Sequence, residues 1–279
     1  MSPMKRPIIS KTSYAPMIFA LIAIGILVGG FIYFSNNHTQ ESEQVITSQH
    51  ATPPVLEPVS NAETPKEEPV VIDKKATEEK NKEFEIVVEY PVIKKGDAEF
   101  EAVNASIKTF VDATVKQFKA DYNNAKNEDV ITHPSTPWSL DMDYAATYQS
   151  ENLISLVFSV SVYAGGAHPN GSIKTLVIDV KNQNILLLDN VLVSDTSLKT
   201  LSALVIDDLK KSDIADDEWI ENGAAPIEEN YEAWHLSDKG MTVLFPAYQV
   251  AAYVMGPQEV TIPFEKLKEV VKADYFIAQ

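Results

Sequence analysis

An uninterrupted apolar run near the N-terminus, Met17 to Phe34, constrains this chain more than any other feature. The run reads MIFALIAIGILVGGFIYF and holds no charged side chain. Because an α-helix rises about 1.5 Å per residue, the run extends roughly 27 Å, close to the thickness of the hydrocarbon core of a bilayer. The sequence therefore predicts one transmembrane helix over residues 17–34.

The charges that flank this run predict its orientation. Lys5, Arg6 and Lys11 precede it, and the first acidic residue of the chain is Glu41. Basic residues stay on the cytoplasmic side, so we expect residues 1–16 to form a short cytoplasmic tail. A cleaved signal peptide is the alternative, but the run is long for one and no small-residue cleavage site follows it. The prediction is a single-pass protein of the cytoplasmic (inner) membrane whose C-terminal part is periplasmic or extracellular.

Charge and composition narrow the partners of the exported part. The chain has a net charge of −17, its only arginine is Arg6, and it has no cysteine. An acidic surface repels nucleic acid and attracts cationic partners, although acidity also serves solubility alone. The lack of cysteine excludes disulfides and thiolate chemistry, and no phosphate-binding glycine motif is present. We therefore expect no nucleic-acid partner and no cofactor.

Residues 35–82 differ in composition from the rest of the chain. They combine five prolines with many Glu, Lys, Thr and Ser residues and contain no aromatic side chain. Such a segment cannot bury a core. The sequence therefore predicts a disordered linker that holds the folded part away from the membrane.

The apolar pattern from residue 83 onward predicts a mixture of helices and hairpins. Spacings of three and four indicate helices at 100–118, with Asp97 as N-cap, and from Asp195 to Leu209. Alternation and apolar runs indicate strands at 83–90, 140–148, 153–163, 173–180, 185–188, 241–245 and 259–262. Pro263 is expected to open a last helix. Without a βαβ rhythm, the predicted class is α+β: a mostly antiparallel sheet with helices packed on one face.

The most distinctive loop is the segment from Tyr163 to Gly171, which reads YAGGAHPNG. Its glycines, Gly165 and Gly166 among them, indicate backbone that needs a positive φ or a close approach. Pro169 keeps His168 out of the helical region. The loop is either a connector between two strands or a rigid platform that presents an imidazole to a ligand.

A second segment, Phe245 to Gly256, reads FPAYQVAAYVMG and concentrates aromatic and soft apolar side chains. Tyr248 and Tyr253 are of the kind that anchors a recognition surface. Ordinary core packing of tyrosine rings is the alternative.

The sequence offers no recognised catalytic or metal-binding motif. Serine-nucleophile motifs are absent, and the histidines of the folded part, His133, His168 and His235, lack the spacing of a helical metal pair. The acidic run Asp213–Glu218 lacks the spacing and the glycine of an EF-hand loop. We therefore predict no catalytic and no metal-binding residue. An acid–base pair of His168 with a nearby carboxylate stays open as the alternative.

Several of these residues resemble exported modules of known type. Tyr163 with Gly165-Gly166-Ala167-His168 resembles the Y-x-G-G-A-H signature of RsiV-like ectodomains. A second motif of the same type is resembled by Phe245-x-x-Tyr248, Ala251-x-Tyr253-x-x-Gly256 and Val260-x-Ile262-Pro263. The earlier part of the chain resembles the accessory domain of PdaC-type peptidoglycan deacetylases, at Tyr90-Pro91-Val92, Phe100 and Asn104-x-x-Ile107. The resemblance implies a PdaC-like part over residues 83–164 and an RsiV-like part over residues 165–279.

The resemblance implies an α+β extracytoplasmic domain. In the RsiV type this domain belongs to a membrane-bound anti-sigma factor and binds lysozyme, a basic protein. The residues before the apolar run are too few for a sigma-binding domain. The metal-binding Asp and paired histidines of a deacetylase domain are also missing, so only the ectodomain carries over.

These observations favour a membrane-anchored binding or sensing module of the cell envelope without catalytic activity of its own. Its candidate partners are peptidoglycan or a basic protein such as lysozyme. The candidate surface comprises Tyr163, Gly165, Gly166, His168, Tyr248 and Tyr253. The alternatives are a cell-wall hydrolase or deacetylase that uses His168, and a lysozyme inhibitor.

Overall fold

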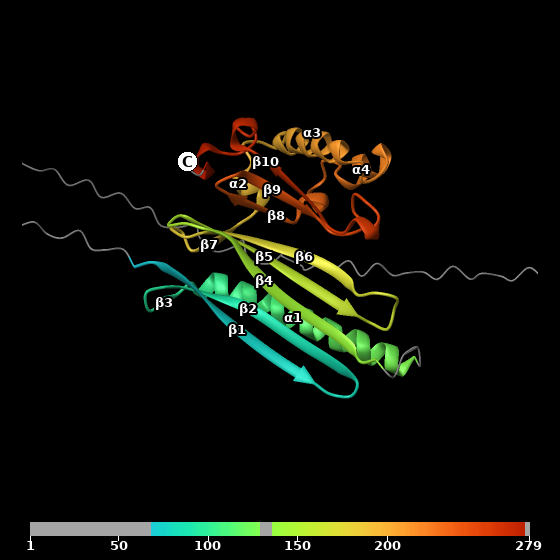
Figure 1. The fold of residues 1–279 in the computed structure, drawn as a ribbon. Helices are drawn as coiled ribbons and strands as arrows, with labels where there is room; N and C mark the ends of the chain where they lie inside the picture. The colour runs from blue at the N-terminus through green and yellow to red at the C-terminus, as the bar shows by residue number, and fades with distance from the viewer. Residues whose placement is uncertain (1–67, 129–135, 277–279) are drawn as a thin grey trace, which may run out of the picture. The chain divides into compact units, whose positions relative to one another are not determined.

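A computed structural model describes residues 68–128 and 136–276 of the chain (Figure 1). The predicted cytoplasmic tail, the predicted transmembrane helix and the larger part of the predicted linker lie outside these residues. Within the two described ranges, no helix combines the length and apolarity that crossing a bilayer requires.

The largest element is a seven-stranded sheet in the order β1-β2-β4-β5-β6-β7, with the short β3 paired to β2. Its neighbouring strands are antiparallel, except that β2 and β4 run parallel. The parallel pair needs a crossover, which helix α1 provides. The strands are β1 (Val70–Lys80), β2 (Phe84–Lys95), β3 (Ala98–Glu99), β4 (Trp138–Gln149), β5 (Leu153–Tyr163), β6 (Asn170–Asp179) and β7 (Asn184–Leu186).

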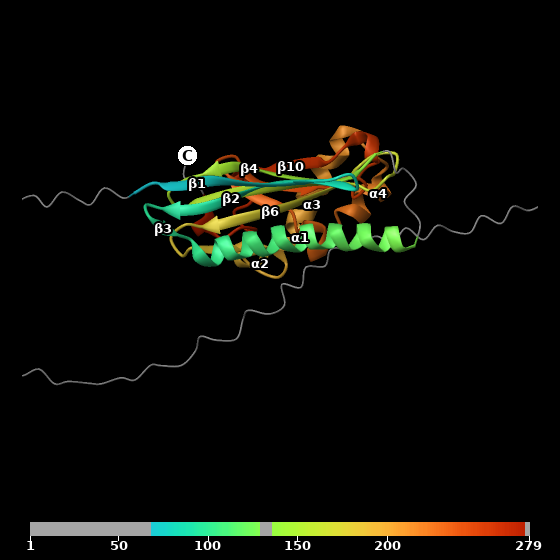
Figure 2. The ribbon, with the colours of Figure 1, turned by 90° about the horizontal axis from the view of Figure 1, so that it is seen from below.

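Helix α1 (Glu101–Asn127) lies along one face of this sheet, as Figure 2 shows from below. Its apolar stripe, from Val103 to Tyr122, meets alternate residues of β2, β4 and β5. At one end of this core, Tyr122 packs edge-on against Trp138, with 5.5 Å between ring centroids. The interlocked rings hold the helix in register on the sheet.

The C-terminal part forms a second layer on the opposite face of β5 and β6. Its three-stranded antiparallel sheet has the order β10-β9-β8, made of β8 (Trp234–Ser237), β9 (Gly240–Phe245) and β10 (Gln258–Ile262). The helices α2 (Leu188–Val191), α3 (Ser197–Leu209) and α4 (Asp217–Gly223) accompany it, as do short 3-10 turns.

Alternation along β5 and β6 explains why both faces of the large sheet are covered. Ile154 and Ile178 belong to the core beneath α1, whereas Leu153 and Val177 belong to the core of the C-terminal layer. Successive side chains of a strand point to opposite faces, so these strands are apolar on both sides.

Two buried hydrogen bonds join the layers directly. The Ser155 hydroxyl donates to the Leu236 carbonyl oxygen at 2.6 Å, and the Trp234 N–H donates to the Thr175 hydroxyl at 2.9 Å. Both Ser155 and Thr175 are buried. Such bonds fix the position of β8 over β5 and β6, because an unpaired polar group in this interior is costly.

The predicted α+β class is confirmed, with a mostly antiparallel sheet and a helix packed on one of its faces. The second sheet, which covers the other face, was not predicted. Helix α1 covers one face, and the C-terminal sheet with α3 lies over the other. The connection through α1 also makes one parallel pair, β2 with β4. The sequence pattern does not reveal this arrangement because strand order is a tertiary property.

The structure also corrects the end of the predicted linker, since Val70–Lys80 is strand β1 and not part of a disordered segment up to residue 82. Most of β1 is exposed, and cross-strand ion pairs attach it to β2. These include Lys74 with Glu89 at 2.9 Å and Lys80 with Glu85 at 2.7 Å. A polar edge strand of this kind lacks the apolar alternation by which a strand is recognised.

Other helix and strand boundaries also differ from those expected from the sequence. Helix α1 has no side-chain N-cap, β2 runs through Pro91, and the expected helix after Pro263 is only the 3-10 turn Phe264–Lys266. Strand β8 and helix α4 were not predicted.

Replacing Ser155 by alanine removes the hydroxyl that pairs with the Leu236 carbonyl. We expect the free energy of unfolding to fall by about 1–3 kcal/mol, the cost of leaving a buried polar group unsatisfied. Ser159→Ala, on an exposed site of the same strand, is the matched control and should change it by less than about 0.5 kcal/mol. Urea denaturation followed by tryptophan fluorescence measures both, and equal effects would refute the interlayer role.

His235 generates a prediction of pH dependence. Burial lowers the pKa of its imidazole below the ordinary 6.5, so the unfolded chain binds a proton first as the pH falls. Stability contributed by the neutral ring is therefore complete above about pH 6.5 and declines as the pH falls below that value. His235→Gln should lose less stability between pH 7 and 5 than the wild type. Urea denaturation at several pH values measures the free energy of unfolding of both chains. An equal decline of this free energy between pH 7 and 5 in the two chains would contradict the assignment to His235.

Candidate functional site

Two segments without a charged side chain converge on one part of the molecule. No Asp, Glu, Lys or Arg occurs between residues 152 and 173 or between residues 240 and 258. The first segment contains β5 and the turn into β6, and the second contains β9 and the loop that follows it. In a chain of net charge −17, this is a local break in the acidic surface.

Aromatic rings from both segments are in direct contact. The His168 imidazole stacks on the Tyr253 ring, with 3.9 Å between centroids and 19° between planes. Tyr248 lies beside Tyr253, at 5.4 Å and 32°. The Tyr253 hydroxyl also donates to the Pro169 carbonyl at 3.3 Å, which bridges the two segments a second time. We call His168, Tyr248 and Tyr253 the aromatic surface.

The aromatic surface is accessible and is flanked by apolar side chains. Tyr248 is 55% exposed and Tyr253 is 37% exposed. Val254 and Met255, which follow Tyr253, are 87% and 44% exposed. Exposed rings beside exposed aliphatic groups form an amphipathic contact area rather than a core.

The other predicted site residues support this surface instead of forming it. Gly165 is buried and has a φ of +83°, a left-handed conformation that glycine adopts without steric cost. Tyr163 is half-buried at the end of β5, opposite Ser139 of β4. Gly166 is exposed in the same turn. The structure thus brings His168, Tyr248 and Tyr253 together, while Tyr163, Gly165 and Gly166 shape the turn.

Sequence reasoning missed one residue that positions the site, Trp219 of α4. Its indole N–H donates to the Tyr248 carbonyl at 3.2 Å. Tyr248 has a φ of +76°, a left-handed backbone that costs a residue with a side chain about 1–2 kcal/mol. The side-chain amide of Gln249 donates hydrogen bonds to the carbonyls of Gly223 and Asn230. The signal available in the sequence was a lone tryptophan within an acidic run.

Among residues 68–128 and 136–276, no side chain forms an acid–base pair with His168. Its Nδ1 lies 2.9 Å from the Pro169 carbonyl, and over the described ranges no carboxylate is hydrogen-bonded to the ring. In the same part of the chain, no group of three or more His, Asp or Glu residues could hold a metal ion. The arrangement therefore suits contact recognition through ring faces more than proton transfer.

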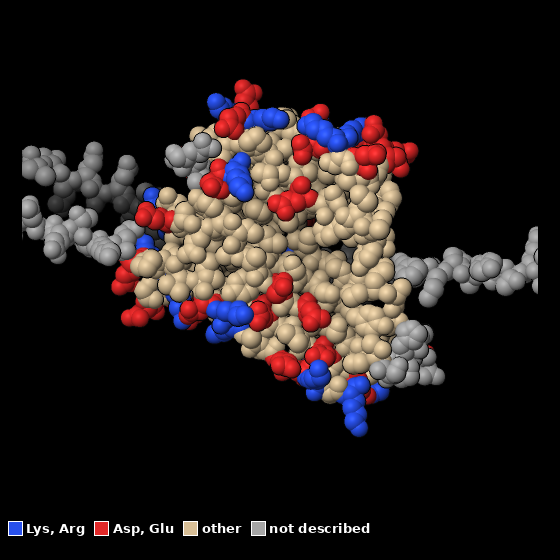
Figure 3. All heavy atoms as spheres, viewed as in Figure 1, with Lys and Arg blue, Asp and Glu red and all other residues tan. Residues whose placement is uncertain are grey.

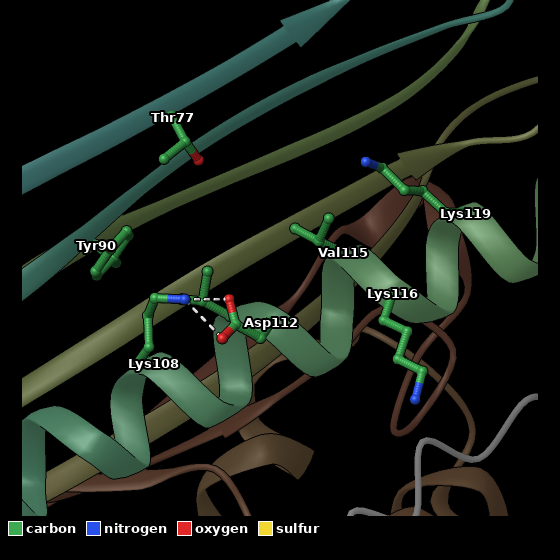
Figure 4. Close-up of a pocket in the computed structure, with 8 residues that line it drawn as sticks. Thr77, Tyr90, Lys108, Asp112, Val115, Lys116 and Lys119 are labelled. Carbon is green, nitrogen blue, oxygen red and sulfur yellow. Dashed lines mark hydrogen bonds and ion pairs between the residues drawn. The ribbon is translucent and has the colours of Figure 1, made fainter.

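A separate groove of about 390 Å³ runs between β1, β2 and α1 (Figure 4). Thr77, Tyr90 and three lysines of α1 contribute to its lining. Lys108 is paired with Asp112, and Lys119 with Glu79 at 2.6 Å. Figure 4 shows the Lys116 ammonium directed away from Tyr90. With two of its three cations already neutralised, the groove is a weak candidate for an anion site.

The face of the large sheet opposite α1 carries acidic side chains beside the C-terminal layer (Figure 3). Alternation places Asp141 and Asp143 there, because Leu140 and Met142 are buried beneath α1. In the same view, the side near the turn from β5 to β6 is largely uncharged.

Two family models match separate parts of this chain. Residues 77–171 match the family model described as deacetylase PdaC, and residues 189–265 match a protein family of unknown function, DUF3298. The chain therefore contains a PdaC-like segment followed by a DUF3298-like segment. The first match begins within β1, which agrees with the ordered part starting before residue 83.

A particular relative is the peptidoglycan-N-acetylmuramic acid deacetylase PdaC of Bacillus subtilis (strain 168). It is 30% identical to this chain over 178 residues, which cover 63% of this chain and 37% of the relative. The chain thus spans little more than a third of that protein. The predicted PdaC-type likeness is confirmed, whereas the RsiV-type likeness stays a prediction.

Two crystal structures share the fold. A DUF3298 family protein of Pseudomonas aeruginosa PAO1 has a TM-score of 0.55 and 17% identity, over 76% of this chain and 99% of that one. A DUF3298 family member of Bacteroides fragilis NCTC 9343 has a TM-score of 0.54 and 19% identity, over 75% and 96% of the respective chains. At these identities the likeness concerns the fold alone.

Replacing Trp219 by phenylalanine keeps an aromatic ring but removes the donor to the Tyr248 carbonyl. We expect faster amide hydrogen exchange in the turn from Pro246 to Ala252, with a loss of global stability of about 1 kcal/mol or less. The amides of the turn at Ser150–Leu153 serve as an internal control. Unchanged exchange at Tyr248 and Gln249 would show that Trp219 does not hold this loop.

Proposed function

We propose that this chain is a membrane-anchored, extracytoplasmic module of the cell envelope that binds a partner and has no catalytic activity of its own. The observation that carries the proposal is the exposed aromatic surface, in which His168 stacks on Tyr253 and has no carboxylate partner among the described residues. Exposed tyrosine rings in a defined geometry are typical anchors of recognition.

The location rests on the sequence. The apolar run at residues 17–34 follows Lys5, Arg6 and Lys11, an arrangement that favours a cytoplasmic N-terminus and an exported C-terminal part. The linker that follows would let the folded part reach the cell wall from the cytoplasmic membrane.

Peptidoglycan is the first candidate partner. The relative with 30% identity is named as a deacetylase of peptidoglycan, and its similarity to this chain includes residues of the PdaC-like segment. A segment shared with a protein that acts on this polymer supports binding of the same polymer here.

A basic protein such as lysozyme is the second candidate partner. The net charge of −17 and the acidic face that includes Asp141 and Asp143 are complementary to a cationic protein. The RsiV-type resemblance also supports lysozyme as a partner. A domain that binds lysozyme could inhibit the enzyme, so the inhibitor function belongs to this candidate.

The catalytic alternative, a hydrolase or deacetylase that uses His168, has less support. General acid–base catalysis needs a second titratable group within hydrogen-bond reach, and Pro169 supplies only a carbonyl oxygen. A His168→Ala chain with peptidoglycan-cleaving or deacetylating activity equal to that of the wild type would remove this alternative.

Co-sedimentation of the detergent-solubilised full-length chain with insoluble peptidoglycan tests the proposal, beside calorimetric titration with lysozyme at low and high salt. We expect wall binding that resists salt, or lysozyme binding that weakens with salt because its attraction is electrostatic. Binding to neither, or a chain recovered free in the cytoplasmic fraction of cells, would contradict the proposed function.

A further inference from the structure

The chemistry of the aromatic surface restricts the class of ligand. Its two contributing segments, residues 152–173 and 240–258, hold no carboxylate, ammonium or guanidinium group. A phosphate or carboxylate ligand would find no cation in these segments, and an ammonium ligand would find no anion. The contacts on offer are ring faces, aliphatic groups, hydroxyls and backbone groups.

The ring geometry suits a ligand with flat apolar faces and a polar rim. His168 covers Tyr253 in a parallel stack, and Tyr248 adjoins it at a 32° tilt. Tyrosine combines an apolar face with a hydroxyl, so it can pack against C–H groups and hydrogen-bond at the same time. A pyranose ring presents C–H groups on its faces and hydroxyls around its edge, which matches both demands.

The aliphatic groups beside the rings add a second requirement. Val254 is 87% exposed and Met255 is 44% exposed, next to Tyr253. Exposed apolar groups at a recognition surface gain free energy by covering a methyl group of the ligand. An acetamido substituent on a sugar supplies such a methyl group without adding charge.

We propose that the aromatic surface binds the glycan strand of the cell wall through its N-acetylated amino-sugar rings, rather than through the peptide stems. This inference rests on the proposed function and names the ligand class of its site. Tyr248 and Tyr253 contact the sugar faces, and Val254 with Met255 contact the acetamido methyl. Loss of the acetyl group would place an ammonium against two segments that hold no anion and would remove the methyl contact.

The net charge makes this preference diagnostic. A chain of −17 attracts cationic oligosaccharides nonspecifically, so electrostatics alone would favour glucosamine oligomers over neutral N-acetylglucosamine oligomers. The aromatic surface predicts the opposite order. Comparing the two oligomers at equal length therefore separates the site from the overall charge.

The test is calorimetric titration of the full-length chain in uncharged detergent micelles with N-acetylglucosamine and glucosamine oligomers of equal length. We expect tighter binding of the acetylated oligomer, little changed by salt, and about tenfold weaker binding by Tyr253→Ala or Tyr248→Ala. Leu187→Ala is the matched control, because Leu187 is 52% exposed and lies in the connection between β7 and α2.

Each remaining outcome decides a different question. If the chain binds insoluble peptidoglycan but prefers the glucosamine oligomer, or if both tyrosine variants bind like Leu187→Ala, the glycan site is refuted while the proposed function stands. If the chain binds lysozyme and no oligomer, the glycan inference falls and the basic-protein partner remains. If the chain binds neither the cell wall nor lysozyme, both the proposed function and this inference are refuted.

Discussion

The arrangement of this domain depends on the buried contact between β5, β6 and β8. The Ser155 hydroxyl pairs with the Leu236 carbonyl, and the Thr175 hydroxyl accepts from the Trp234 N–H, in an interior that water does not reach. Directional bonds of this kind fix register where apolar packing alone would tolerate a shift. Because β9 is paired to β8, the loop after β9 is carried to the turn between β5 and β6. The aromatic surface is therefore a product of interlayer packing.

Local features then hold the rings in place. Gly165 allows the left-handed turn that presents His168, and Trp219 with Gln249 ties the loop that carries Tyr248 to α4. A tyrosine with a φ of +76° is strained, and such strain persists only where the surroundings enforce it. Preorganised rings lose little conformational entropy when a ligand arrives, which is an advantage for a shallow, uncharged surface.

The sequence predicted the elements whose burial produces a simple pattern. Strand β5 is found at Leu153–Tyr163 as predicted, because its dense apolar run covers two cores, and α1 follows from its stripe of three and four spacings. Strand β1 was not predicted, because ion pairs such as Lys74 with Glu89 attach it to β2 in place of an apolar pattern. The role of Trp219 was not predicted either, because its indole acts through the backbone carbonyl of Tyr248. The candidate residues His168, Tyr248 and Tyr253 came from a glycine-containing loop and an aromatic segment, and a motif resemblance joined the two. The contact of their rings depends on tertiary structure that no local pattern encodes.

The PdaC-like and DUF3298 segments thus meet at one uncharged surface on an otherwise acidic body. The most direct test of its role is a map of backbone amide shifts during titration of the full-length chain with N-acetylated wall oligosaccharides. We expect the perturbed amides to cluster in residues 163–171 and 246–257. Perturbations concentrated along the lysine-lined groove of α1 or on the acidic face around Asp141 would contradict the assignment of this surface as the binding site.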